Sequence, residues 1–254
     1  MWKKLSCLLI ILAFGQPWVQ AATTAQLKHT YGAWTEILQT YVDDQGRTDF
    51  HGLAKDSDGL QQLVRFINQV SPKSHPQLFP SPEHVLAYHI NAYNILAMHG
   101  VIDRGIPKNF DNFLKRASFF KFRSVVIGGD KTSLSDYENN VIRPLDEPRV
   151  HFALNCMVRD CPRLPRQAFV ADELEQQLDE VTIEFFEKDQ HIRIEDDEKT
   201  IYLSAILDFY TEDFVTSGKF QDLASYVNLY RKQPVPEDFK VKFIRYDWTI
   251  NQQP

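Results

Sequence analysis

Four residues whose side chains could carry chemistry lie within eleven positions: His151, Asn155, Cys156 and Cys161. A thiol beside an imidazole is the minimum set for nucleophilic catalysis, because the imidazole can hold the thiol as a thiolate. The cluster therefore predicts a hydrolase or acyl transferase with Cys156 as the nucleophile and His151 as the base, acting on a peptide, a peptidoglycan fragment or an ester.

A catalytic imidazole also needs a carboxylate or an amide on its second nitrogen, which Glu138 or Asn91 could supply. His151 and Cys156 are five positions apart on an expected extended segment, so their side chains meet only if the chain turns at Asn155. Backbone amides after Asn155 would then form an oxyanion site. Glu138 has a competing interpretation as the last residue of a helix capping box that begins at Ser135.

The N-terminus has the pattern of a secretory signal peptide. Lys3 and Lys4 precede an apolar run from Leu5 to Phe14, and small residues end at Ala21. The run is about half of the roughly 20 residues that a membrane-spanning helix needs. The sequence therefore predicts that residues 1–21 are cleaved and that residues 22–254 are periplasmic or secreted, with no integral membrane segment.

Removal of residues 1–21 leaves 26 basic and 34 acidic side chains, a net charge of −8, and only two cysteines, Cys156 and Cys161. In an oxidising compartment, two cysteines five positions apart favour a disulfide, with a reactive thiol and metal ligation as the alternatives. A disulfide would leave Cys156 without a free thiol. The spacing His-x4-Cys-x4-Cys matches no recognised zinc site, so neither a metal nor another cofactor is predicted.

A binding module is the second hypothesis, and whether the protein is an enzyme stays open at this point. In this hypothesis Arg143, Arg149, Asn91, Asn94 and Asn155 hold a small anionic ligand or a peptide, and the disulfide is structural. Alternatively, the arginines pair with acidic side chains and the asparagines are buried amides that hold loops in place. The acidic net charge excludes general nucleic-acid binding, which depends on a basic surface.

Helical and strand patterns alternate irregularly along the chain, which favours an α+β fold. We expect one domain of helices around a small, mainly antiparallel sheet, with a helical N-terminal part at 22–82 and a core at 83–254. The expected helices cover 25–42, 59–70, 82–102, 135–143, 172–186, 204–215 and 220–230. The expected strands cover 122–127, 149–155, 191–194, 201–203 and 240–247.

Three ordered motifs carry a resemblance to a known family. They are Tyr88–Asn94 (YHINAYN), Ser133–Glu138 (SLSDYE) followed by Arg143, and Arg149–Cys156 (RVHFALNC) followed by Cys161-Pro162-Arg163-Leu164. Together they resemble the DUF547 family, a domain of unknown function found in bacteria and plants. The resemblance extends from about Trp34 to Trp248 and implies an exported bacterial member, but it implies no activity.

Overall fold

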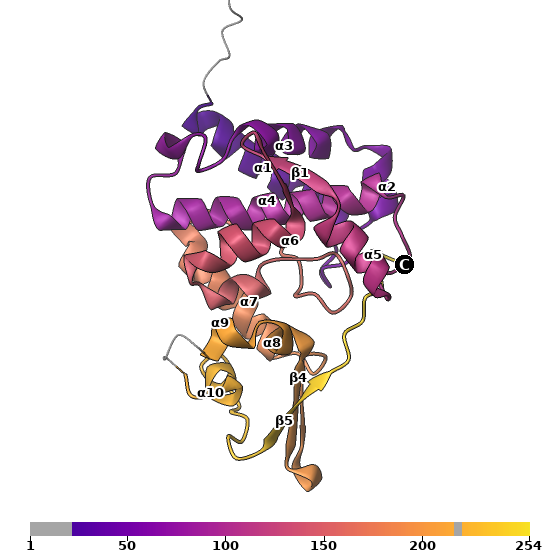
Figure 1. The fold of residues 1–254 in the computed structure, drawn as a ribbon, viewed down its shortest axis with the longest axis vertical. Helices are drawn as coiled ribbons and strands as arrows, with labels where there is room; N and C mark the ends of the chain where they lie inside the picture. Colours follow the sequence, from indigo (N-terminus) through magenta and orange to yellow (C-terminus); the bar gives the residue numbers. More distant parts are fainter. Residues whose placement is uncertain (1–21, 216–219) are drawn as a thin grey trace, which may run out of the picture.

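One long helix, α4 (Pro82–Asp103), runs through the helical part of the computed structural model, which describes residues 22–215 and 220–254 (Figure 1). Every residue of α4 from Leu86 to Met98 is buried, as expected for a helix that is apolar on nearly all sides. No helix in the described part of the chain is long and apolar enough to cross a membrane. The predicted signal peptide, residues 1–21, lies outside the described residues.

The N-terminal helices and a β-hairpin pack over one side of α4 (Figure 1). Their bounds are α1 (Thr24–Tyr41), α2 (Phe50–Lys55), α3 (Asp58–Gln69), β1 (Ser124–Ile127) and β2 (Asp130–Ser133). The apolar stripe expected on α1 is buried at Leu27, Trp34 and Leu38. A capping box at Thr23 and Gln26 begins this helix by satisfying its first free amides.

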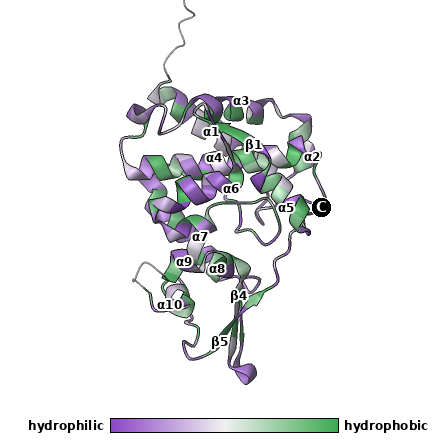
Figure 2. Ribbon diagram, viewed as in Figure 1, coloured by the Kyte–Doolittle hydropathy of each residue, from purple (hydrophilic) through white to green (hydrophobic). Residues whose placement is uncertain are grey.

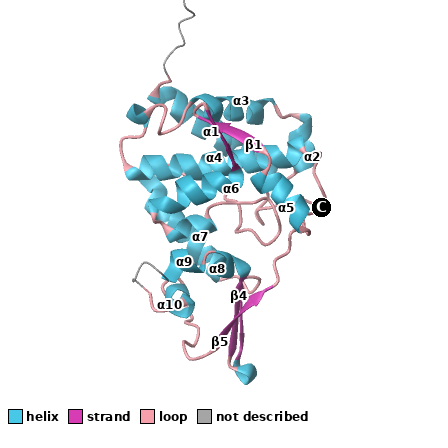
Figure 3. Ribbon diagram, in the orientation of Figure 1, coloured by secondary structure: helices cyan, strands magenta, loops and turns pink. Residues whose placement is uncertain are grey.

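The second half of the chain adds short helices and a three-stranded sheet at the end remote from α1 and α3 (Figure 3). Strand β4 pairs antiparallel with β3 and parallel with β5. The bounds of these later elements are α7 (Leu174–Phe186), β3 (Ile192–Glu195), β4 (Thr200–Ser204), α8 (Ala205–Phe209), α9 (Thr211–Val215), α10 (Leu223–Asn228) and β5 (Lys240–Ile244), whereas α5 (Phe113–Arg116) and α6 (Leu134–Tyr137) belong to the helical part that contains α4 (Figure 1). The α+β class is thus confirmed, with two small sheets in place of one.

Buried apolar side chains from Leu27 to Ile250 form one core, and the hydrophobic ribbon segments in Figure 2 run through both halves of the chain. After β5 the C-terminal segment returns along the molecule to the helical end (Figure 1). Its backbone accepts hydrogen bonds from the N–H groups of Phe110 and Thr48, at 2.9 Å each. This return path fixes Tyr246 and Trp248 between the two halves.

The predicted strand at 149–155 is wrong. Residues Pro148–Phe152 form a short 3-10 helix, η5, followed by an irregular segment. Proline is favoured in the first turn of a helix, and the Glu147 carboxylate caps the turn by accepting the N–H of Arg149 at 2.9 Å. The residues from Val150 to Asn155 are all buried, so the alternation of faces that the strand required does not occur.

Two predicted details of helix termini also differ from the structure. The residue that caps α6 is Ser133, whose side chain accepts the N–H of Asp136 at 3.0 Å, so the capping box expected at Ser135 and Glu138 is wrong. The helix expected over 204–215 divides at Tyr210 into α8 and α9. The first difference matters for the site, because the Glu138 carboxylate caps no helix and instead accepts a hydrogen bond from Tyr210.

Helix α4 buries an imidazole, His89, whose Nδ1 lies 2.6 Å from the hydroxyl of Tyr137. Burial lowers the pKa of His89 from 6.5 to about 4. The folded protein therefore resists protonation of this group, whereas the unfolded chain takes up a proton below about pH 6.5.

We expect the free energy of unfolding to fall as the pH falls from about 6.5 towards 4, with a slope from this one group of up to ~1.4 kcal/mol per pH unit. Urea unfolding at a series of pH values measures it, and the slope in this window should be shallower in a His89→Gln variant. An exposed-site control, His51→Gln, should keep the slope of the unmodified protein. An unchanged slope in His89→Gln would contradict the assignment.

Candidate functional site

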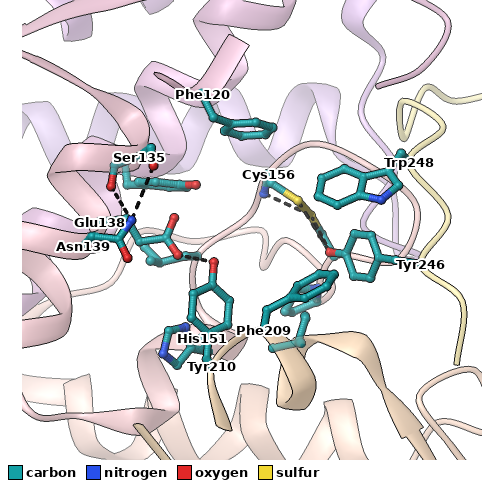
Figure 4. A pocket seen from close by; sticks show the side chains of 15 residues that line it. Phe120, Ser135, Glu138, Asn139, His151, Cys156, Phe209, Tyr210, Tyr246 and Trp248 are labelled. Carbon is teal, nitrogen blue, oxygen red and sulfur yellow. Dashed lines mark hydrogen bonds between the residues drawn. A yellow bond between two sulfur atoms is a disulfide. The ribbon is translucent and has the colours of Figure 1, made fainter. Parts of the chain in front are cut away.

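A cavity of about 170 Å³ lies between the two halves of the molecule (Figure 4). Three parts of the chain contribute to its wall: the α4–α6 region, the third motif and the α8 region with the C-terminal segment. The lining residues are Tyr93, Phe120, Ser135, Glu138, Asn139, His151, Leu154, Cys156, Cys161, Pro162, Ile206, Phe209, Tyr210, Tyr246 and Trp248. Three of the candidate catalytic residues, Glu138, His151 and Cys156, therefore share one cavity.

Glu138 is buried at one side of this cavity and accepts a hydrogen bond from the hydroxyl of Tyr210 at 2.5 Å (Figure 4). Burial, together with the nearby Glu138 carboxylate, raises the pKa values of Tyr210 and Tyr93 well above 10. Both tyrosine hydroxyls therefore remain protonated at neutral pH and can act as donors. The Glu138 carboxylate thus lies among aromatic side chains, with the hydroxyls of Tyr210 and Tyr93 as its hydrogen-bonding partners.

His151 has a carboxylate partner, which the sequence did not identify. Its Nε2 lies 2.7 Å from Oδ2 of Asp213, and its ring stacks on that of Tyr210 with the centroids 3.9 Å apart. Arg143 donates two hydrogen bonds to the same carboxylate, from Nε at 2.6 Å and from Nη2 at 2.7 Å. Burial alone would raise the pKa of Asp213, but the hydrogen bonds to His151 and Arg143 hold it well below its usual range.

The predicted disulfide joins Cys156 and Cys161, whose Cα atoms are 6.2 Å apart. The backbone N–H of Cys156 donates to Sγ of Cys161 at 3.0 Å, and the hydroxyl of Tyr246 lies 3.6 Å from each sulfur. Cys156 therefore has no free thiol in this state. Cys156 and His151 both line the cavity, but among the described residues no hydrogen bond joins their side chains.

The three asparagines expected to bind a ligand are buried and hydrogen-bonded to backbone. Asn91 donates to the carbonyl of Phe169 at 2.7 Å and accepts that residue's N–H at 3.0 Å. Asn94 donates to the carbonyl of Ala153 at 3.0 Å and accepts the N–H of Asn155 at 2.7 Å. These are the loop-holding amides of the alternative interpretation, and neither Asn91 nor Asn94 lines the cavity.

Asn155 provides the turn that the catalytic hypothesis required. Its side chain donates to the carbonyl of Pro162 at 2.7 Å and accepts the N–H of Met157, also at 2.7 Å. Met157 has φ of 66°, a left-handed conformation that is uncommon for a residue other than glycine. The side chain of Asn155 thereby holds the loop that brings Cys156 and Cys161 together.

The two candidate arginines are paired with carboxylates. Arg143 is paired with Asp213, as described above. Arg149 forms ion pairs with Glu147, Glu175 and Asp179 at 2.6–2.8 Å, and its hydrogen bonds to these groups raise its pKa. Arg149 does not line the cavity. A bound anion would have to compete with these carboxylates for either guanidinium group.

Four residues that complete the site were not predicted from the sequence. Tyr210 and Asp213 were within an expected helix, three positions apart and thus on one face. Tyr246 lies in the expected strand 240–247 and Trp248 directly follows it, so an extension of the strand by one residue would place both on one side. These spacings were the available signal, but nothing in the sequence connects Asp213 with His151, 62 positions earlier.

The site residues do not form a metal centre. Among the described residues, no group of three or more histidine, cysteine or carboxylate side chains is arranged to hold a metal ion. The four candidate ligands near the third motif are instead engaged with other groups: His151 with Asp213, Cys156 with Cys161, and Glu138 with Tyr210.

Asn94 offers a direct test of how the third motif is held. We expect Asn94→Ala to lower the free energy of unfolding by about 2–4 kcal/mol, because the buried N–H of Asn155 and the buried carbonyl of Ala153 both lose their partner. Urea unfolding measures this loss. Gln176→Ala on the exposed side of α7 is the control and should stay within about 0.5 kcal/mol of the unmodified protein. A similarly small change in Asn94→Ala would show that the amide is dispensable.

Comparison with known proteins finds one family that matches part of the chain. Residues 79–186 match the family described as "Protein of unknown function, DUF547". Searches of the curated proteins and of the solved structures found no match. The matched segment contains α4 and all three motifs, whereas the wall formed by Tyr210, Tyr246 and Trp248 lies outside it. The match supports the DUF547 assignment for residues 79–186, a family that is itself described as of unknown function.

Proposed function

We propose that this domain is a binding module whose cavity takes a small organic ammonium ion. One observation carries the proposal: the buried Glu138 carboxylate faces an aromatic-lined cavity and forms no salt bridge with a described residue. A buried charge is costly unless an opposite charge or several hydrogen bonds compensate it. Arg143 does not neutralise Glu138 by direct contact. Its guanidinium group donates to Asp213 and Asn139 and attracts Glu138 only at longer range.

The opposite side of the cavity supplies the aromatic faces that attract a cation. The ring centroids of Tyr246 and Trp248 are 4.7 Å apart, and Phe209 lies 5.6 Å from Tyr246 and 6.3 Å from Trp248. Figure 4 shows these rings across the cavity from Glu138 and Tyr210. Aromatic rings grouped in this way bind quaternary and other organic ammonium groups through cation–π attraction.

Charge favours a cation over the anionic ligand expected from the sequence. Arg143 and Arg149 are both engaged with carboxylates, and the charged groups that line the cavity are Glu138 and, when protonated, His151. Size limits the ligand further. A cavity of about 170 Å³ is smaller than the roughly 300–1,000 Å³ typical for drug-sized ligands. The cavity therefore fits an ammonium head group, either free or at the end of a larger molecule.

We expect choline to bind and to change the fluorescence of Trp248, while its neutral isostere 3,3-dimethylbutan-1-ol binds at least about tenfold more weakly. Glu138→Gln removes the charge with almost no change of shape and should raise the dissociation constant for choline about tenfold, ~1.4 kcal/mol. Fluorescence titration and calorimetry give both constants.

The matched control for that titration is Glu180→Gln on the exposed side of α7, which should bind choline as the unmodified protein does. Equal binding of choline and its isostere, or an unchanged constant in Glu138→Gln, would rule out the carboxylate as the recognition element. Binding of the isostere alone would identify the cavity as a site for neutral apolar groups.

A second candidate function is a Cys/His-dependent hydrolase that acts only after reduction of the disulfide. The observation in its favour is the His151–Asp213 pair, since a carboxylate on one nitrogen fixes the tautomer and leaves the other nitrogen to act as a base. Two electrons and two protons from an external thiol reductant would convert Cys156 and Cys161 to thiols. Glu138 stays a candidate for the acid–base group in this proposal.

Export is part of the proposal as well: residues 1–21 direct a bacterial DUF547 protein to the periplasm or medium. The disulfide supports this location, because disulfides persist in oxidising compartments.

We expect the protein isolated from the periplasm to begin at Ala22 and to take up no iodoacetamide until it is reduced, with intact mass giving both results. If the hydrolase candidate holds, the reduced protein cleaves 4-nitrophenyl acetate, the oxidised protein does not, and His151→Asn loses about 100-fold in rate. His51→Asn is the control and keeps the rate. A free thiol in the untreated protein would contradict the disulfide as the resting state.

A further inference from the structure

The most exposed large apolar side chains of the described residues lie close together in the sequence. Phe113, Leu114 and Phe122 are 67%, 75% and 77% exposed, whereas the next such residue, Leu229, is 57% exposed and lies elsewhere. Single exposed apolar residues are normal, but a group of them marks an interaction site. We call these three residues the apolar group.

The segment that carries the apolar group is regular and anchored. Helix α5 continues directly into η2 (Ala117–Lys121), and the side chain of Asn112 caps α5 by accepting the N–H of Lys115 at 2.8 Å. Phe119 is fully buried and its ring lies 4.6 Å from that of Phe110. The apolar group is therefore presented by a packed helical segment and does not result from a loose loop. In Figure 2 this part of the ribbon contains strongly hydrophobic residues at the edge of the molecule.

The segment that carries the apolar group is rich in basic residues. Residues 104–123 contain six basic side chains and one acidic side chain, a net charge of +5 in a chain whose total is −6. Lys108, Lys115 and Lys121 form no ion pair with any residue that the structure describes. Unpaired lysines also occur elsewhere among the described residues, so the local net charge of +5 is what distinguishes this segment. This local excess of positive charge attracts an anionic partner.

We propose that this segment docks the protein on the surface of an anionic lipid bilayer. Apolar side chains that enter the interface, next to lysines that attract anionic head groups, are the two elements of peripheral membrane binding. Three exposed side chains fall short of the roughly 800 Å² per partner that a stable protein interface buries, and a bilayer needs no shaped counterpart. The inference is independent of the ligand proposed for the cavity.

The same segment reaches the cavity from its other side. Phe120, in η2, lines the cavity, and the guanidinium of Arg116 lies 4.8 Å from the ring centroid of Trp248. Docking through the apolar group would therefore place the cavity close to the membrane surface, within reach of molecules that carry an ammonium group at that surface.

Vesicle sedimentation with the mature protein, residues 22–254, tests the proposal. We expect binding to vesicles of phosphatidylglycerol and phosphatidylcholine, at least tenfold weaker binding to pure phosphatidylcholine, and loss of most binding in 0.5 M NaCl, because salt screens the lysines. The triple variant Phe113→Ser/Leu114→Ser/Phe122→Ser should bind the anionic vesicles at least tenfold more weakly. So should Lys115→Glu/Lys121→Glu.

The matched control is Leu145→Ser/Ile183→Ser/Leu229→Ser, which removes three exposed apolar side chains elsewhere and should bind as the unmodified protein does. Circular dichroism confirms that each variant is folded. Failure of the unmodified protein to bind anionic vesicles overturns the proposal without any variant. An equal loss of vesicle binding in the control triple variant also overturns it. So does self-association that depends on the apolar group without vesicle binding, which would instead indicate an interface between copies of the chain.

Discussion

The hydrogen bonds between the asparagines of α4 and the backbone of later segments are the interactions on which the rest of the structure depends. Asn94 joins α4 to both sides of the turn at Leu154, and Asn91 joins it to Phe169. A buried amide satisfies two backbone groups that have no water to replace it, so the loops that follow the third motif can be irregular and still buried. The Asn94 bonds thereby hold the backbone between His151 and Cys156, the first residue of the disulfide.

A second constraint joins the two halves of the molecule through charge. Asp213, in α9, accepts from Arg143 and His151, which precede it by 70 and 62 positions. Because the carboxylate is partly buried and shared by two partners, it fixes the ring of His151, and Tyr210 stacks on that ring and donates to Glu138. The Glu138 carboxylate in the cavity is thus oriented by contacts through Tyr210, His151 and Asp213, which join one half of the fold to the other.

Much of the fold could be predicted because local patterns specify it. The stripe on α1, the helix expected over 82–102 and the hairpin of β3 and β4 each depend on neighbours a few positions away. The wrong strand prediction at 149–155 has a physical cause. At 149–155 the residues alternate as in a strand, but Pro148 and the Glu147 cap favour a helical turn, and burial on both sides removes the signal that alternation carries.

The sequence by itself determined the class of fold, the family resemblance, the disulfide and the set containing Glu138, His151 and Cys156. Residue type and spacing along the chain are enough for these conclusions, because helices, strands and a disulfide between near neighbours depend mainly on residues a few positions apart. Only the tertiary structure decided which groups face one another: that Asp213 and not Glu138 holds His151, that Arg143 and Arg149 are engaged, and that an aromatic wall from the C-terminal segment completes the cavity. Those pairings join residues tens of positions apart, and packing of the whole chain selects them.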